Sequence, residues 1–119
     1  MPEPADNARI VLTTTATPEE ARTLSRTLVE EGLAACVSIV PSIESVYRWE
    51  GKIESANETM LLIKTAKEHL AALEQRLHAV HSYDVPEFLV LPLEAGSAPY
   101  LKWLDENLRS VSPFAAEKE

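Results

Sequence analysis

Apolar and polar positions along the chain follow two different periodicities, and these divide it into strands and helices. A β-branched, apolar run at 8–14 predicts a buried strand. Between Thr17 and Gly32, apolar residues recur at spacings of three and four, which places Ala21, Leu24 and Leu28 on one helical face. Thr17 is expected to cap this helix, with the carboxylate of Glu20 reaching back to the cap, and Gly32 to end it.

The middle of the chain is predicted to form a long β-hairpin. Extended, apolar runs at 33–40 and 43–49 are typical of one strand that is interrupted by the pair Pro41 and Ser42. A tight turn is expected at 50–52, because Gly51 tolerates the backbone conformation that such a turn needs. The chain then returns through a partner strand at 53–64.

The second half of the chain predicts a helix at about 67–81, a strand at 87–93 and a final helix that begins near Ser97. The element order is therefore β-α-β-β-α-β-α. Together these elements predict an α+β, ferredoxin-like βαββαβ sandwich with an extended hairpin and an extra C-terminal helix. We expect a single domain over residues 1–119, with an ordered core at about 8–110, a loose N-terminal arm and a short frayed tail.

The hairpin is too long for a lone sheet of this kind. Its strands run from about residue 34 to about residue 64, whereas ordinary strands have about 5–6 residues. Their ends should overhang the sheet and expose unpaired backbone groups and apolar side chains. Pairing with further copies of the chain would cover them, and we expect this; a hairpin that folds back at Pro41 is the alternative.

Composition and charge narrow the possible partners. The 119 residues are 45% hydrophobic and 25% charged, as in a soluble globular protein, and the net charge is −8. A negative surface repels nucleic acid and anionic lipid, so we expect neither as a partner. The lone Cys36 cannot form an internal disulfide, and the N-terminus lacks the basic and apolar pattern of a secretory signal, so a cytoplasmic location is expected.

Several local strings resemble those of one known family. They are LAACV (33–37), SVYRWEGK (45–52), IKT (63–65), HSYDVPE (81–87) and YLKWL (100–104). Over about residues 9–108 the chain resembles CutA, the divalent-cation tolerance family. The resemblance implies a ferredoxin-like homotrimer whose long hairpins join sheets between subunits. It also implies a link to metal tolerance, with copper binding ascribed to some members.

Three residues are candidate metal ligands. His78 and His81 lie three positions apart and can share one helical face, and imidazole is a good ligand for copper, zinc and nickel. The thiolate of Cys36 suits a soft metal such as Cu(I). The alternatives are a solvated His78, a His81 that satisfies the last helical carbonyls and a Cys36 that packs as a small apolar residue.

A polar cleft between subunits, near the base of the hairpin, is the second candidate site. The residues expected to line it, together with His81, are Trp49, Glu58, Lys64, Tyr83 and Glu87. Polar groups beside aromatic rings suit a small anionic or metal-bearing ligand. A purely structural ion pair between Lys64 and Glu87 is the alternative.

The sequence carries no Walker loop, dinucleotide-binding glycine motif, H-E-x-x-H string or G-x-S-x-G string. We therefore expect no enzyme and no organic cofactor, but a homotrimer for divalent metal tolerance, with copper or another divalent ion as ligand. A trimer like the PII signalling proteins, with small-molecule clefts between subunits, is the alternative by analogy of fold. A small hydrolase or isomerase that uses His81 and Glu87 is a third and weaker one.

Overall fold

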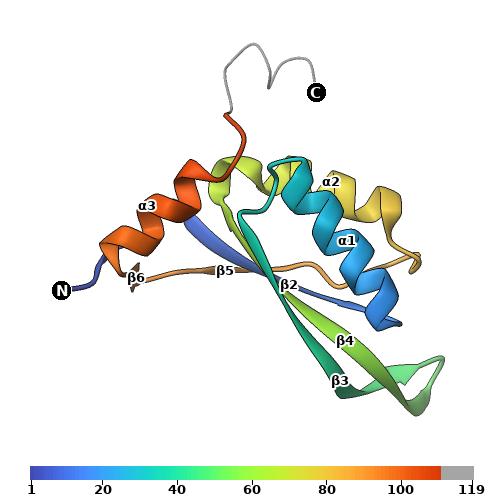
Figure 1. Cartoon of the computed structure of the whole chain (residues 1–119). Coiled ribbons are helices and arrows are strands. Elements are labelled where there is room, and N and C mark those ends of the chain that lie inside the picture. The colour runs from blue at the N-terminus through green and yellow to red at the C-terminus, as the bar shows by residue number, and fades with distance from the viewer. Residues whose placement is uncertain (111–119) are drawn as a thin grey trace.

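An antiparallel sheet of four strands, in the order β3-β4-β2-β5, lies at the centre of the protein (Figure 1). It is described by a computed structural model of residues 1–110. The elements are β1 (Glu3–Pro4), β2 (Ala8–Thr15), α1 (Pro18–Glu30), β3 (Cys36–Trp49), β4 (Lys52–Ala66), a 3-10 turn (Lys67–His69), α2 (Leu70–Val80), β5 (Leu89–Pro92), β6 (Ala95–Gly96) and α3 (Ala98–Glu106). The predicted tail at 112–119 lies outside the described residues.

The chain order of these elements confirms the predicted α+β, ferredoxin-like arrangement. The six central elements run β2-α1-β3-β4-α2-β5, and β2 pairs with both β4 and β5 at the middle of the sheet. The core lies between one face of the sheet and the helices, and its buried side chains include Val11, Leu24, Leu28, Leu61, Ile63, Leu73 and Leu77. Burial of each large aliphatic side chain stabilises the fold by about 1.5–3 kcal/mol.

The alternation along β4 separates the two faces of the sheet. Leu61 and Ile63 are fully buried beneath the helices, whereas Met60 and Leu62 on the other face remain half-buried. On β5, Leu89 and Leu91 are exposed. The face away from the helices is therefore apolar and uncovered within one chain.

The start of α1 differs from the expected capping box. The hydroxyl of Thr17 accepts a hydrogen bond from the Glu20 N–H at 3.1 Å, as predicted. The carboxylate of Glu20 does not return to Thr17, and that prediction is wrong. It accepts instead from the backbone N–H and the hydroxyl of Ser82, both at 2.9 Å. The loop after α2 brings two donors to one carboxylate, which a return to the cap could not match.

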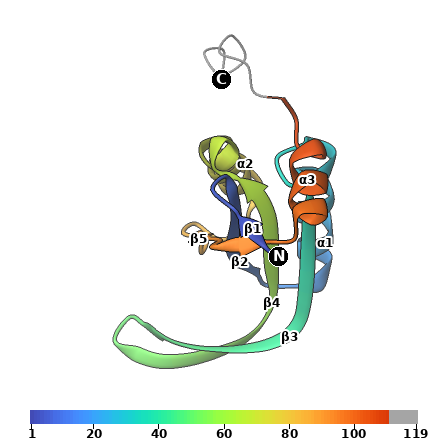
Figure 2. The same cartoon turned by 90° about the vertical axis from the view of Figure 1, so that its left-hand side faces the viewer.

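The hairpin of β3 and β4 runs well beyond the rest of the sheet. Strand β2 pairs with β4 only at residues 59–66, so residues 43–58 pair only with each other. The predicted break at 41–42 is a register shift between Val40 and Ile43. Glu50 and Gly51 both have positive φ, as a two-residue turn requires. Figure 2 shows the hairpin curving away to the side opposite α1, without closing onto its own sheet.

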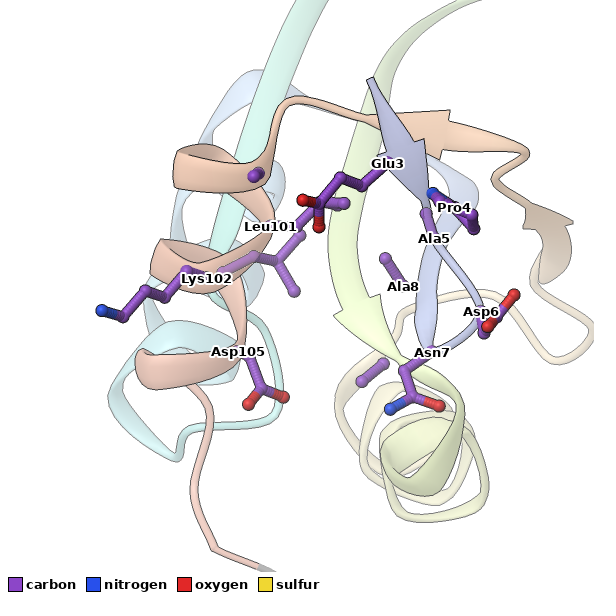
Figure 3. A pocket seen from close by; sticks show the side chains of 12 residues that line it. Glu3, Pro4, Ala5, Asp6, Asn7, Ala8, Leu101, Lys102 and Asp105 are labelled. Carbon is purple, nitrogen blue, oxygen red and sulfur yellow. The ribbon is translucent and has the colours of Figure 1, made fainter. Parts of the chain in front are cut away.

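The N-terminal arm is ordered, contrary to the loose arm expected. Strand β1 pairs with β6, and the Ala5 N–H donates to the Glu94 carbonyl at 3.1 Å. Ala5 is buried against a small cluster that contains Leu104 of α3. A pocket of about 400 Å³ lies between this arm and α3, with Lys102 and Asp105 along its helical side (Figure 3). Two paired residues are too short a segment for a periodic pattern to detect.

Among residues 1–110, no helix combines the length and the apolar character that crossing a membrane would require.

Candidate functional site: a groove at the base of the hairpin

A groove of about 770 Å³ lies between the hairpin and the loop that follows α2. Its lining residues come from β2, β3, β4 and that loop; they are Thr14, Ser45, Val46, Tyr47, Trp49, Glu54, Ala56, Glu58, Tyr83, Asp84, Val85 and Glu87. Four of the six residues predicted for the cleft are among them, namely Trp49, Glu58, Tyr83 and Glu87.

Two residues predicted for the cleft, His81 and Lys64, do not line the groove. Lys64 lies farther along β4. It is six residues from Glu58 along β4, which corresponds to about 20 Å at the rise of an extended strand. Its Nζ donates to the hydroxyl of Ser38 and lies 3.7 Å from Sγ of Cys36, its cross-strand neighbour. The ion pair between Lys64 and Glu87 therefore does not form, and the groove lacks the cation that an anionic ligand would need.

His81 holds the loop in place from behind the groove. Its side chain is fully buried, and Nε2 lies 2.7 Å from the carbonyl oxygen of Thr14. The backbone N–H of Tyr83 donates to Nδ1 at 3.0 Å. A carbonyl only accepts and an N–H only donates, so these partners select the neutral tautomer with its proton on Nε2. Both ring nitrogens are engaged, and neither offers a free lone pair.

Tyr83 and Glu58 connect the loop to the hairpin. The Tyr83 hydroxyl donates to Oε2 of Glu58 at 2.8 Å. Burial, and then the hydrogen bond to Glu58, raise the pKa of Tyr83 well above its ordinary value, so the phenol stays a donor. Burial, and then the charge of Glu58, also raise the pKa of Glu87. The two carboxylates therefore repel each other within the groove.

The three candidate metal ligands do not converge. His78 is exposed on α2. Cys36 lies on β3, where its side chain contacts Lys64 of the neighbouring strand β4. Both ring nitrogens of His81 already have hydrogen-bond partners. Over residues 1–110 there is no group of three or more His, Cys, Asp or Glu side chains placed to hold a metal ion. Within one chain, these residues do not fit a metal site.

Sequence reasoning missed several residues of the groove, among them Tyr47, Glu54 and Asp84. The hairpin register pairs Tyr47 with Glu54, two positions along from Trp49. Side chains two apart on a strand share a face, so Tyr47 lies on the face of Trp49 and Glu54 lies on the same face of β4 as Ala56 and Glu58. Strand alternation therefore carries a signal for Tyr47 and Glu54 once Trp49 and Glu58 are candidates. Asp84 follows Tyr83 in an irregular loop, for which no periodic signal exists.

Comparison with known proteins identifies the family to which the chain belongs. The family described as "CutA1 divalent ion tolerance protein" matches residues 9–107. The chain belongs to the CutA1 divalent ion tolerance family. The predicted resemblance to CutA is thereby confirmed.

Proteins that are similar to this chain over more than four fifths of its length are also named CutA. The divalent-cation tolerance protein CutA of Thermus thermophilus is 47% identical over 98 residues, which cover 82% of this chain and 95% of the relative. The chloroplastic CutA of Arabidopsis thaliana is 46% identical over 101 residues, 85% of this chain. That match covers 56% of the plant protein, so the chain spans about half of its length.

Solved CutA structures share the fold. The structure of CutA from Synechococcus elongatus has a TM-score of 0.88 at 44% identity and covers 92% of this chain and 96% of its own. The divalent cation tolerance protein from Thermus thermophilus has a TM-score of 0.84 at 45% identity, with coverage of 86% and 99%. These matches support a CutA assignment and give no support to the PII-like alternative.

Proposed function

We propose that this CutA protein works as a homotrimer that binds divalent metal ions, copper among them, and contributes to metal tolerance. The names of relatives support the link to metal, since those from Thermus thermophilus and Pectobacterium atrosepticum are called divalent-cation tolerance proteins. The second of these is 42% identical over 106 residues, and the match covers 96% of that relative.

The main observation that supports the proposed trimer is the exposed apolar surface of the overhanging hairpin. Val46 is 67% exposed, Trp49 60% and Ile53 65%, all on a segment that pairs with no other strand of the chain. Large exposed apolar side chains on an unpaired edge favour association with another chain. The uncovered face of the sheet, with Leu89 and Leu91 on β5, extends this surface. Closed rotational symmetry would cover three such hairpins at once.

Metal binding would depend on that assembly. The candidate donors Cys36, His78 and His81 lie apart within one chain, and a tight site needs several ligands at once. We propose that donors from more than one subunit combine, with the exposed His78 as the most accessible of the three. His81 would have to give up its bonds to Thr14 and Tyr83 to take part.

The protein would act by binding rather than by catalysis. His81 is the strongest candidate for a general base, and both its nitrogens are held by backbone groups. We also propose a cytoplasmic location, since a half-buried free thiol such as Cys36 is typical of a reducing compartment.

Native mass measurement tests the assembly. Multi-angle light scattering at micromolar concentration should give three times 13.2 kDa, about 40 kDa. Ile53→Asp places a charge on the hairpin outside the groove and should shift the mass toward the single chain. Val29→Asp, at an exposed valine on α1, is the matched control and should keep the trimer. A single-chain mass for the unaltered protein would overturn the proposed trimer.

Calorimetry with cupric chloride tests the metal claim separately. The unaltered protein should bind copper with a defined stoichiometry, and Ile53→Asp should lose that binding together with its assembly. His78→Ala and Cys36→Ser then identify the donors, each with its mass checked. Heats that are the same for all variants and lack a stoichiometric end point would reject a specific copper site.

A further inference from the structure

We propose that the groove at the base of the hairpin receives the back of the hairpin of a second copy of this chain, with Arg48 of that copy among the groove carboxylates. The back of the hairpin is the face that carries Arg48 and Ile53, opposite to the groove. This contact rests on the trimer proposed above and goes further, because it names the two surfaces that meet.

The groove carries negative charge without a cation in its lining. Its four carboxylates belong to Glu54, Glu58, Asp84 and Glu87, and no lysine, arginine or histidine is among the lining residues. A neutral surface that covered the groove would take water away from these carboxylates and give nothing in return. A chain that covers the groove must therefore bring a cation.

The back of the hairpin offers a cation beside an exposed aliphatic side chain. Arg48 and Ile53 stand opposite each other in the hairpin register, next to the pair of Tyr47 and Glu54 that lines the groove. Neighbouring side chains on a strand point to opposite faces, so Arg48 and Ile53 point away from the groove of their own chain. Both are exposed, Ile53 to 65%.

Arg48 has no carboxylate partner among residues 1–110. The one hydrogen bond of its side chain is long, at 3.4 Å from Nη1 to the carbonyl oxygen of Gly51. Arg76, in contrast, is held by Glu31 through three hydrogen bonds of 2.8–3.1 Å. A guanidinium pairs with carboxylates through two parallel hydrogen bonds, and Arg48 is available for such pairing.

The bend of the hairpin makes the two faces complementary in shape. Glu58 and Met60 lie two positions apart on β4, so the groove continues the sheet face that lies away from the helices. Figure 2 shows the hairpin bending toward that side. The groove face is therefore concave and the back is convex, and the back of one hairpin fits into the groove of the next.

The aromatic walls of the groove complement the apolar part of the back. Trp49 and Tyr47 line the groove and are 60% and 44% exposed. The partner's Ile53 would pack on these rings, and a guanidinium over an aromatic ring is attracted by its quadrupole. Aromatic residues and arginine are the side chains that most often dominate the energy of protein interfaces.

The symmetry of this contact agrees with a trimer. Groove and back are different surfaces, so each chain gives its back to one neighbour and its groove to the other. Such a head-to-tail contact cannot form a two-fold dimer, in which both chains use the same surface. It closes into a ring when the rotation fits, and three chains then bury three grooves.

Charge reversal tests the contact in the full chain. Arg48→Glu should shift the light-scattering mass at micromolar concentration from about 40 kDa, three times 13.2 kDa, toward the single chain. Arg48→Lys keeps the charge and should keep the trimer. Arg22→Glu makes the same reversal at an exposed arginine of α1 and is the matched control, for which the mass should not change.

A second reversal tests whether the two surfaces meet. Glu54→Lys places a cation in the groove, and like Arg48→Glu it should raise the concentration of half-dissociation at least about tenfold. The double variant has opposite charges again at every contact and should recover the trimer. Arg48 and Glu54 lie on opposite faces of one hairpin, so this recovery arises between chains. It also shows that the single variants still fold.

Three results would overturn the contact, and they differ in what else they reject. A single-chain mass for the unaltered protein rejects the trimer itself. A trimer that tolerates Arg48→Glu as well as Arg22→Glu remains a trimer, but its chains meet elsewhere. Losses in both single variants without recovery in the double variant mean that the two charges do not face each other.

Discussion

The hydroxyl of Tyr83 donates to Oε2 of Glu58 across 2.8 Å, and this bond joins two segments that are 25 residues apart in the chain. Glu58 lies where the hairpin leaves the sheet, and Tyr83 lies in the loop that follows α2. The loop is fixed at its other side by His81, whose ring contacts the Tyr83 ring at 4.8 Å between centroids. The groove is therefore held open between two tethered segments.

Removal of this bond should loosen the loop measurably. Tyr83→Phe keeps the ring and deletes the hydroxyl, and we expect the free energy of unfolding to fall by about 1 kcal/mol. Glu58→Ala removes the acceptor, and a double-mutant cycle in urea isolates the pair. A coupling energy of about 1 kcal/mol is expected, and strictly additive losses would show that the bond contributes nothing to stability.

Removal of a buried hydroxyl on β2 should raise the free energy of unfolding rather than lower it. Oγ1 of Thr13 is fully buried and has no hydrogen-bond partner among the described residues. Thr13→Val keeps the shape and removes the unsatisfied group, so the free energy of unfolding should rise by about 1 kcal/mol. Thr65→Val is the matched control, because Thr65 Oγ1 donates to the Leu33 carbonyl at 2.8 Å. That variant should lose about 1–2 kcal/mol in the same urea titration.

The core and the hairpin could be predicted because their signals are periodic and long. Ala21, Leu24 and Leu28 repeat at helical spacing, and all three are buried against the sheet as expected. The overhang of the hairpin followed from counting residues between Ala34 and Lys64. Such patterns need several turns or several alternations, and these elements provide them.

The contacts that shape the groove could not be predicted in the same way. Glu20 was placed by its spacing from Thr17, but its carboxylate binds Ser82, which is 62 residues away. Lys64 was grouped with Glu58 by chemistry, while the strand separates them by six residues. The neighbours of Glu20 are set by tertiary packing rather than by local sequence. The distance between Lys64 and Glu58, in contrast, follows from the rise of the strand that the sequence predicts at 53–64.

The raised pKa of Glu87 predicts a pH-dependent stability. Burial, and then the charge of Glu58, raise this pKa above the ordinary 4.5, so the folded chain holds the proton more tightly than the unfolded chain. The stabilisation is complete below pH 4.5 and is lost as the pH rises through the raised value. Glu87→Gln should therefore be more stable than the unaltered protein at pH 7 and should lose this advantage in acid.

Thermal unfolding of both proteins between pH 3 and pH 8 provides the measurement. Glu58→Gln should reduce the difference between them, because it removes the second cause of the shift and still accepts a hydrogen bond from Tyr83. A difference of the same size at every pH would mean that Glu87 acts through packing alone.

Two glycines with the same backbone conformation should differ in their tolerance of a side chain. Gly32 and Gly51 have φ of 71° and 80°, so alanine at either position costs about 1–2 kcal/mol. A Cβ at Gly32 would also lie 2.7 Å from Cβ and 2.9 Å from N of Arg109, whose N–H donates to the Gly32 carbonyl at 2.9 Å. At Gly51 it would meet nothing within 4 Å. We expect Gly32→Ala to lose at least about 1 kcal/mol more than Gly51→Ala in urea unfolding, because the segment after α3 must also move. Equal losses would mean that Arg109 gives way at no cost and that only the backbone conformation matters.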